Sequence, residues 1–415
     1  MRPLCVAILG CGTAGPAAAL HLARQGHAVA VFEKVAAPGP VGAGIVLQPI
    51  GQVALAGLGL LTPIRDRGAR IDGLRCTTAT GRSVVAIDYA DVSPRLFGLG
   101  LHRGALFEVL FAAVSAEPGV KLHLGVEAIA LRRQAGARVV VDREGQEHGP
   151  FDLVIVADGA HAELPDDVPL PQRLRPYPYG ALWHVAVDPQ GRRQGQLRQV
   201  VEGTRRLVGL LPTGHGPGGG PPMVSLFWSL RADQQAAFRA GDHRAFQAEL
   251  RRYFPDEAWI ADAVPDAHAL LYSGYRDLVM PRWASEDVVY IGDAAHAMSP
   301  QLGQGANLAL VDAAVLADCI AQSPSVPAAL DRYGKARRHH LDFYQFMTRW
   351  LTPFFQSDLT LLGPLRDWGL WLGLKVPWVR RQMVETMIGM KLGLFRRSLA
   401  LEAVTPPALE GATQG

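Results

Sequence analysis

A glycine-rich turn between an apolar strand and an alanine-rich helix occupies the N-terminus. Residues 4–9 form a continuous apolar run typical of a buried strand, and the sequence GCGTAG (residues 10–15) follows it directly. A second strand, over residues 28–32, ends at Glu33. This strand, turn and helix, with an acid about 20 residues on, make up the dinucleotide-binding fingerprint. The chain is therefore predicted to begin with a Rossmann-type α/β unit.

The three glycines of this turn have separate roles. Gly10 allows the tight turn, Gly12 lets a pyrophosphate approach the backbone, and Gly15 lets the helix pack closely on the strand. Glu33 is placed to bind ribose hydroxyls. The residues that we expect to hold the nucleotide half of the ligand are Gly10, Gly12, Thr13, Ala14, Gly15, Glu33 and Lys34.

A second match to G-x-G-x-x-G, at Gly214, Gly216 and Gly219, tests the specificity of the first. Prolines surround it, and a strand-like run over residues 223–230 follows it. No helix can begin there, so we predict a flexible surface loop and no nucleotide site.

The segment DVVYIGDAAHAMSPQLGQGANLALVDAA (residues 287–314) predicts the other half of the ligand site. A short strand over residues 288–291 runs into Gly292 and Asp293, and glycines then open an apolar helix. Asp293 suits sugar-type hydroxyls, while bare amides at the helix start suit an electron-rich ring. This pattern indicates a flavin, and His296 within it is interpreted as structural. The expected contacts are Gly292, Asp293, Pro300, Gly303, Gln304, Gly305, Ala306 and Asn307.

Two further markers lie between these segments. A buried-type strand over residues 151–157 ends at Asp158 and Gly159, which places a carboxylate where ligands of such folds bind. Arg103 precedes an apolar helix over residues 106–114. A cation at a helix start is disfavoured by the helix dipole unless it faces an anion such as a pyrophosphate.

Taken in order, these motifs resemble the set found in class A flavoprotein monooxygenases of the para-hydroxybenzoate hydroxylase type, over about residues 1 to 350. The resemblance implies FAD as cofactor, NADPH or NADH as reductant and O2 as co-substrate. It implies hydroxylation of a hydrophobic aromatic or phenolic molecule through a flavin C4a-hydroperoxide. It also adds Gly44 and Val126 to the cofactor contacts. Pro300, Gln301 and Gly303 would form the catalytic surroundings of the ring, and no acid–base residue is assigned.

The chain departs from the family after Asp158 and Gly159. The family commonly continues with a Ser and then an Arg, whereas Ala162 and Pro165 stand here. Nicotinamide contacts would therefore need other arginines, and His161 in the same loop is interpreted as solvated.

Composition excludes several classes of protein. The formal net charge is only +3 over 415 residues, so no nucleic-acid surface is expected. No apolar run reaches the roughly 20 residues of a membrane span. The four cysteines have neither metal-ligand nor disulfide spacing, and no metal site is predicted. The N-terminus imitates a secretion signal, but the glycine spacing and Glu33 favour a cytoplasmic enzyme.

The expected architecture is a Rossmann-type FAD-binding domain (residues 1–70, 100–176 and 277–350) with an interleaved antiparallel-sheet substrate domain (71–99 and 177–276). Strand-like runs at 181–187, 197–201, 206–211 and 223–230 would roof the substrate pocket. Because side chains alternate along a strand, only one face can line it. The candidate substrate contacts are Gln48, Tyr179, Trp183, His184, Leu211, Phe227 and Trp228.

Residues 351–404 are predicted to form C-terminal helices, and residues 405–415 a disordered tail. The helices are interpreted as a cap over the substrate pocket, or else as an interfacial helix or dimer face. The chain would be a monomer or a homodimer, with peripheral membrane contact through these helices as an open alternative.

Other activities on the same fold stay open. An epoxidase, a Baeyer–Villiger oxygenase, a prenyl-chain reductase or a halogenase would share the FAD motifs, although the Trp-x-Trp-x-x-Ile-Pro motif of halogenases is absent. A non-enzymatic flavin-binding sensor is the alternative of another class.

Overall fold

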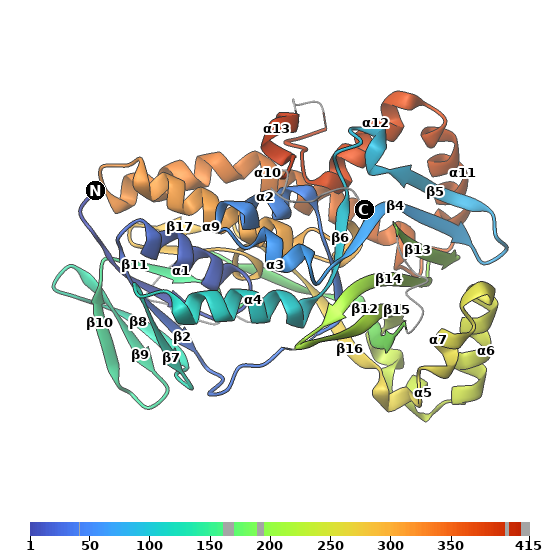
Figure 1. Cartoon of the computed structure of the whole chain (residues 1–415), viewed down its shortest axis with the longest axis horizontal. Helices are drawn as coiled ribbons and strands as arrows, with labels where there is room; N and C mark the ends of the chain where they lie inside the picture. The colour runs from blue at the N-terminus through green and yellow to red at the C-terminus, as the bar shows by residue number, and fades with distance from the viewer. Residues whose placement is uncertain (41, 161–169, 189–194, 395–397, 408–415) are drawn as a thin grey trace.

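Three sheets and the helices that cover them form the α/β fold predicted from the sequence (Figure 1). The computed structural model describes the chain except residues 41, 161–169, 189–194, 395–397 and 408–415. Most of the tail that was predicted to be disordered, and the loop with His161, Ala162 and Pro165, lie outside the described residues. No helix in the described part is long and apolar enough to cross a bilayer.

A six-stranded sheet carries the N-terminal glycine turn at its centre. Its order is β17-β18-β11-β1-β2-β7, and every neighbouring pair is parallel except β17 with β18. The strands are β1 (Cys5–Leu9), β2 (Ala28–Glu33), β7 (Val120–Leu124), β11 (Leu153–Val156), β17 (Ala284–Ser285) and β18 (Val288–Tyr290).

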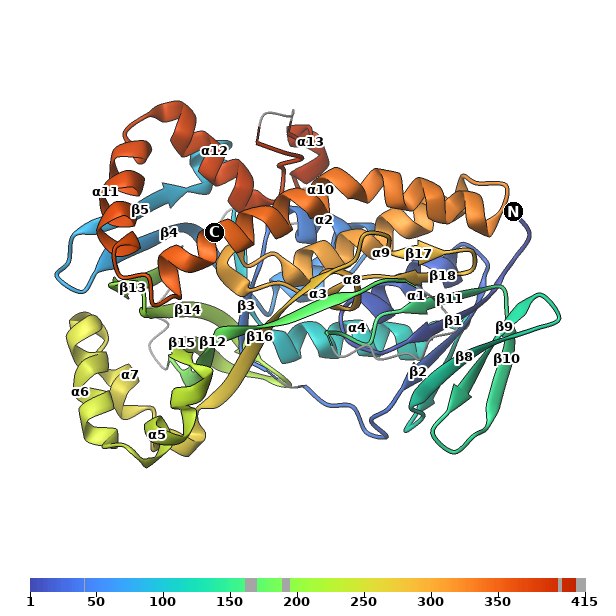
Figure 2. The same ribbon diagram turned by 180° about the vertical axis from the view of Figure 1, so that it is seen from behind.

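The central strand β1 is apolar throughout because both faces of the sheet are covered. Val6 and Ile8 face helices on one side, and the intervening Ala7 and Leu9 face a second core on the other. The helices that contribute to the first core include α1 (Ala14–Arg24), α4 (Arg103–Ala116) and α9 (Gly305–Ala321). Helix α10 (Val326–Phe355) lies along α9 on the outer side (Figures 1 and 2).

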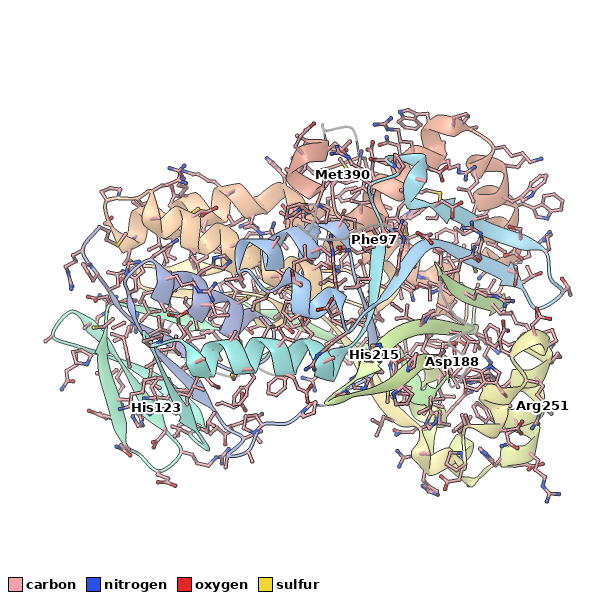
Figure 3. All side chains as sticks on the ribbon, in the orientation of Figure 1. Phe97, His123, Asp188, His215, Arg251 and Met390 are labelled. Atoms are coloured by element: carbon pink, nitrogen blue, oxygen red, sulfur yellow. The ribbon has the colours of Figure 1, made fainter. Side chains whose placement is uncertain are left out.

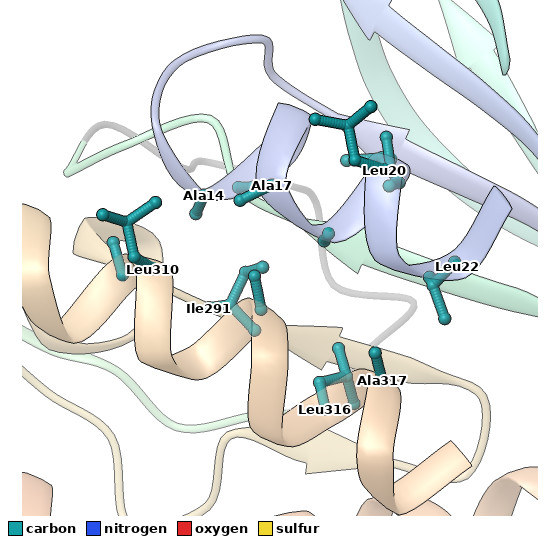
Figure 4. Close-up of a cluster of buried hydrophobic side chains, with 14 of the residues drawn as sticks. Ala14, Ala17, Leu20, Leu22, Ile291, Leu310, Leu316 and Ala317 are labelled. Atoms are coloured by element: carbon teal, nitrogen blue, oxygen red, sulfur yellow. The ribbon is translucent and has the colours of Figure 1, made fainter. Parts of the chain in front are cut away.

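Helices α1 and α9 pack on one another through small side chains, so the two ligand-binding segments lie side by side. Ala14 and Ala17 of α1 face the α9 side chains Leu310 and Leu316 across Ile291 (Figure 4). Alanines allow the close approach because they add little bulk. The two glycine-rich segments, far apart in sequence, therefore share one core.

A three-stranded sheet covers the face of the parallel sheet that lies opposite the helices of the first core. It consists of β8 (Ala128–Gln134), β9 (Ala137–Asp142) and β10 (Glu147–Phe151) in the order β10-β9-β8. The ring of His123, labelled in Figure 3, stacks on Phe32 with 4.7 Å between centroids. Phe151 meets the same Phe32 ring edge-on at 6.0 Å, so aromatic packing joins the two sheets.

The third sheet has nine strands in the order β16-β12-β15-β14-β13-β4-β6-β3, with β5 paired to β4. It is mostly antiparallel as predicted, but β13 and β4 run parallel. The strands are β3 (Gly44–Leu47), β4 (Ala69–Thr78), β5 (Ser83–Asp88), β6 (Gly98–His102), β12 (Arg173–Val187), β13 (Gly195–Glu202), β14 (Arg206–Gly216), β15 (Gly219–Arg231) and β16 (Leu271–Val279).

The predicted flexible loop around the second glycine motif is wrong. Strand β14 continues to Gly216 and β15 starts at Gly219, so the glycines form a tight hairpin in which these two residues pair. Gly214, Gly218 and Gly219 all have positive φ, which glycine adopts readily. The prediction that no helix starts here is confirmed.

Helices cover both faces of the nine-stranded sheet. One face packs on α5 (Gln235–Ala240), α6 (His243–Tyr253) and α7 (Trp259–Asp262), and the other meets α11 (Leu362–Leu374) and α12 (Pro377–Ile388). Shorter helices are α2 (Pro49–Gly57), α3 (Leu61–Arg65), α8 (Asp293–His296) and α13 (Leu401–Val404). The labelled Arg251 of α6 and Met390 beyond α12 mark these two groups in Figure 3.

Candidate active site

One continuous cavity of about 1230 Å³ joins the two glycine-rich segments. It extends from the turn after β1, past the ends of β2 and β11, to the loop before α9 and on to the nine-stranded sheet. The predicted residues that line it are Gly10, Gly12, Thr13, Ala14, Glu33, Lys34, Gly44, Gln48, Arg103, Val126, Asp158, Trp183, Leu211, Phe227, Asp293, Pro300, Gln301, Gly303, Gln304, Gly305 and Ala306. The predicted residues that do not line it are Gly15, Tyr179, His184, Trp228, Gly292 and Asn307.

Backbone groups and one carboxylate build the N-terminal end of the cavity. Gly10 has a φ of +101° and donates its N–H to the carbonyl oxygen of Phe32 at 2.8 Å. The Glu33 carboxylate accepts the N–H groups of Cys11 and Val35, at 2.9 and 3.0 Å. Each carboxylate oxygen has about two acceptor sites, so Glu33 can still accept sugar hydroxyls.

Gly12 and Gly15 differ in what surrounds them. A Cβ added at Gly12 would meet no atom within 4 Å, so the backbone there faces open space. A Cβ added at Gly15 would lie 2.0 Å from the carbonyl oxygen of Gly10. Gly15 therefore lets helix α1 pack on the turn and does not face the cavity.

At the far end, the turn that precedes α9 leaves its backbone open to the cavity. Gly303 has a φ of +61°, and a Cβ there would meet nothing within 4 Å. Asn307 lies behind this turn. Its Nδ2 donates to the carbonyl oxygens of Gly303 and Val46, at 3.0 and 3.1 Å. Its Oδ1 accepts the N–H of Gln48 at 2.8 Å. Asn307 thus fastens the turn to the start of α2, which corrects its predicted place at the ring.

A buried ionic network that sequence reasoning missed holds the Gly292 turn. Asp312 of α9 accepts the N–H of Gly292 at 2.9 Å and contacts His296 Nε2 at 2.6 Å and Arg337 Nε at 2.7 Å. Burial alone would raise the pKa of Asp312, but the Arg337 and His296 charges hold that pKa well below its usual range. Gly292 and His296 are therefore structural here. The sequence signal for this network was Asp312, an acidic residue within an otherwise apolar helix.

The network continues to the C-terminal helices through His340 of α10. Arg337 donates to His340 Nδ1 at 2.6 Å, and His340 Nε2 donates to the carbonyl oxygen of Gly389, at the end of α12, at 2.8 Å. Burial and the Arg337 charge lower the pKa of His340 to about 3, so the ring is neutral. One chain of hydrogen bonds therefore connects the Gly292 turn with the end of α12.

Asp158 borders the middle of the cavity. Its carboxylate is open to the cavity, but the surrounding protein removes part of its hydration. This desolvation raises the pKa of Asp158 to about 6. The positive charge of Lys34 opposes the rise, and the negative charge of Glu33 adds to it. Arg276 of β16 also lines the cavity and donates to the carbonyl oxygen of Ala160 at 3.4 Å. It supplies an arginine close to the Asp158 loop.

The part of the cavity beyond the α9 turn is apolar. Strands β4, β5 and β12–β15 and helices α10–α12 enclose it, and no described residue that they contribute to its wall is charged. Its polar groups bond mainly to each other: the Tyr89 hydroxyl donates to Gln48 Oε1 at 2.7 Å, and Gln301 Nε2 to Gln356 Oε1 at 2.8 Å. Helices α11 and α12 contribute Leu370, Val379, Met383, Thr386 and Met387, as expected of a cap.

Strand alternation decides which aromatic residues reach this apolar part. Trp183 and Phe227 are register partners of β12 and β15 on the cavity side, with ring centroids 5.5 Å apart. The adjacent His184 and Trp228 point to the other face. There His184 Nε2 bonds to Ala263 O at 2.9 Å, and Trp228 packs on Phe246 beside a separate hollow of about 540 Å³.

Tyr179 is the third candidate substrate contact that the structure corrects. It lies in the middle of the same strand, where its hydroxyl donates to Asp358 at 3.0 Å. This contact joins the sheet to the segment after α10, outside the cavity. Tyr179 lies four residues before Trp183 and so on the same face of β12, which means that its position along the strand keeps it from the cavity.

Comparisons with known proteins agree with this geometry. The FAD binding domain family matches residues 4–343. Kynurenine 3-monooxygenase of Salinispora arenicola is 32% identical over 370 residues, which cover 81% of this chain and 77% of that protein. The 3-amino-4-hydroxybenzoate 2-monooxygenase of Streptomyces cremeus is 30% identical and covers 79% of this chain and 81% of its own length.

Solved structures show the same fold. A probable FAD-dependent monooxygenase of Pseudomonas aeruginosa, PqsL, superposes with a TM-score of 0.75 at 24% identity, over 89% of this chain and all of that one. The 2-methyl-3-hydroxypyridine-5-carboxylic acid oxygenase gives a TM-score of 0.72 at 22% identity and covers 85% and 93% of the two chains. With the family match, the two-ended cavity and these relatives, the chain belongs to the FAD-dependent monooxygenases of the class A flavoprotein type.

Proposed function

We propose that this protein is a single-component monooxygenase that uses FAD, NAD(P)H and O2 to hydroxylate an uncharged, hydrophobic aromatic molecule. The observation that carries the proposal is the single cavity that joins both glycine-rich segments and continues into an apolar chamber. That chamber is the part enclosed by β4, β5, β12–β15 and α10–α12, which contribute no charged residue to its described lining. A charged substrate would lose its hydration there without gaining a partner.

The residues at the two ends of the cavity fit FAD. The open space at Gly12 admits a pyrophosphate against the N-terminus of α1, and Glu33 has free acceptor sites for ribose hydroxyls. Arg103 lines the same region and would face the phosphates, and Asp293 would take hydroxyls of the ribityl chain. The residues that would complete the cofactor site are Thr13, Ala14, Lys34, Gly44, Val126 and Asp158.

The surroundings of the ring would be set by the turn before α9. Backbone N–H groups over residues 303–306, together with the positive end of α9, favour negative charge on the electron-rich edge of the ring. FAD supplies the redox chemistry, accepting electrons from the nicotinamide and passing them to O2. The protein would contribute orientation and a dry wall: Pro300, Gln301, Trp183 and Phe227 all line the cavity, and Pro300 and Gln301 would border the ring.

The domain boundaries, the nicotinamide contacts, the location and the oligomeric state belong to the same proposal. The cofactor-binding part would comprise residues 1–70, 100–176 and 277–350, and the substrate part residues 71–99 and 177–276. Arg276 would take over nicotinamide contacts that the departure at Ala162 and Pro165 removes, since it lines the cavity near Ala160. A cytoplasmic location and a monomeric or homodimeric state complete the proposal.

A matched pair of ligands tests the substrate class. Purified protein with bound FAD is mixed with NADPH or NADH, with and without 1-naphthol or its carboxylated counterpart, 1-hydroxy-2-naphthoate. We expect the neutral naphthol to accelerate flavin reduction and to yield a product heavier by one oxygen atom, because the chamber offers no cation for the acid. If the carboxylate is preferred, or if every neutral aromatic tried leaves reduction slow and yields only hydrogen peroxide, the proposal fails.

A further inference from the structure

The C-terminal helices expose a cluster of large apolar side chains. Of the seventeen large hydrophobic residues exposed in the described part of the chain, eight lie between residues 350 and 378, and each is at least 48% exposed. We name this cluster the α11 face. It consists of Leu359, Leu361, Leu365, Trp368, Leu372, Val376 and Trp378, while the eighth residue, Trp350 of α10, lines the cavity. Large exposed apolar surfaces often mark a binding surface in soluble proteins.

The pattern along α11 shows that this exposure is organised. Leu361, Leu365, Trp368 and Leu372 follow one another at intervals of four, three and four residues and therefore share one side of the helix. The opposite side carries the buried Arg366 and the cavity-lining Leu370. An ordinary surface helix places polar residues on its outer side. Helix α11 instead has apolar residues on both sides.

The position of α11 leaves its outer side free of other described elements. In both views α11 and α12 form an outer corner of the molecule, on the far side from the parallel sheet (Figures 1 and 2). Their inner sides already contact the cavity and the nine-stranded sheet. What covers the α11 face must therefore come from outside the described part of this chain.

Charge distinguishes between two possible occupants. Residues 346–394 contain six basic residues, of which Arg349, Arg366, Arg380, Arg381 and Lys391 pair with carboxylates. Lys375 has no ion-pair partner among the described residues, and it is exposed beside the face with its ammonium 3.6 Å from the Trp371 ring centroid. A second copy of the α11 face, which is wholly apolar, would offer Lys375 no carboxylate, whereas anionic lipid headgroups would attract it.

We propose that the α11 face docks on the surface of an anionic membrane. The exposed tryptophans and leucines would enter the boundary between headgroups and acyl chains, and Lys375 would lie at headgroup level. Because α11 and α12 also wall the cavity, docking places that wall at the lipid boundary. The attachment is peripheral, through side chains of helices that lie on the bilayer.

Flotation of the full-length protein with vesicles tests this proposal without substrate or reductant. We expect the protein to float with vesicles of three parts phosphatidylcholine to one part phosphatidylglycerol, and several-fold less with phosphatidylcholine alone. The double variant Leu365→Ser/Leu372→Ser should weaken binding by about tenfold, because it removes two apolar contacts from the interface. The matched control is Leu124→Ser/Leu174→Ser, which alters two exposed leucines outside the α11 face and should float like the wild type.

Charge reversal gives a second, independent readout. Lys375→Glu should reduce the preference for anionic over neutral vesicles by at least about fivefold, since one cation near an anionic surface contributes about 1 kcal/mol. Far-ultraviolet circular dichroism checks that each variant is folded.

Three results would overturn the proposal. They are a wild-type protein that floats with neither vesicle, a face variant that floats like the control, and a vesicle-independent dimer that the face variant converts to monomer. Because no catalytic step is measured, failure here leaves the proposed hydroxylation untouched, and the reverse also holds.

Discussion

The carboxylate of Asp312 accepts the backbone N–H of Gly292 at 2.9 Å, and both groups are fully enclosed by protein. This contact joins the middle of α9 to the turn that leads into Asp293, and Arg337 and His296 also donate to the carboxylate. The Gly292 turn therefore depends on an ion pair that does not itself face the cavity.

Replacing Asp312 with Asn should lower the free energy of unfolding by about 3–5 kcal/mol, because Arg337 would be left as a buried, uncompensated charge. The measurement is urea denaturation of the apoprotein, with the affinity for FAD as a second readout. Asp318→Asn, an exposed change on the same helix, is the control and should alter stability little. Equal stability of Asp312→Asn and the control would contradict the structural role.

The destabilisation caused by Asp312→Asn should disappear in acid. Asp312 has a lowered pKa in the folded state, so its stabilisation is fully present above the unfolded pKa of about 3.9 and is lost as the pH falls towards the folded pKa. The difference between wild type and Asp312→Asn should therefore be constant from pH 5 to 8 and shrink below about pH 4. Growth of the difference in acid would reverse the expected sign.

Gly12→Ala and Gly15→Ala should separate ligand binding from folding. At Gly15 the added methyl would lie 2.0 Å from the Gly10 carbonyl oxygen, so this variant should destabilise the apoprotein itself. At Gly12 the methyl enters open space, so apoprotein stability should stay the same while the affinity for FAD falls at least about tenfold. Thermal denaturation of the apoprotein and titration with FAD measure the two effects. Unchanged FAD affinity in Gly12→Ala would move the pyrophosphate elsewhere.

Asp158→Asn should make the apoprotein relatively more stable as the pH rises. Desolvation by the surrounding protein raises the folded pKa of Asp158 to about 6, although its carboxylate is open to the cavity. Its stabilising protonated form is therefore fully present below the unfolded pKa of about 3.9 and is lost as the pH rises through 6. The advantage of the Asn variant over wild type should grow from pH 4 to 7 and then level off. Chemical denaturation across this range measures it, and a flat difference would show that the carboxylate is well solvated.

Trp183→Ala and Trp228→Ala should have opposite consequences, because the two residues face opposite sides of the sheet. Trp228 is 1% exposed, so truncation should cost about 3–5 kcal/mol of stability. Trp183 lines the cavity, so its truncation should change KM or the coupling of NADPH oxidation to hydroxylation by about tenfold, with a smaller loss of stability. A larger kinetic effect in Trp228→Ala than in Trp183→Ala, measured on folded protein, would contradict the assigned faces.

Local patterns were sufficient for both ends of the cavity. Gly10, Gly12 and Glu33 could be placed from spacing alone, since a strand, a turn and a helix are specified by consecutive residues. The corrections concern residues whose place depends on distant partners. Gly292 and Asn307 look like ligand contacts in sequence, yet each is held by partners up to about 260 residues away.

The sequence by itself determined the Rossmann-type core and the composition of the cavity ends, because the apolar runs, the glycines and the terminal acid act within a few residues. Only the tertiary structure decided that Trp183 faces the cavity while Trp228 does not, because a shift of one residue in strand register exchanges the two faces. The tertiary structure likewise brought Asp312 to Gly292 and left the α11 face uncovered. Side chains from separate helices meet or remain exposed only when the whole chain has packed.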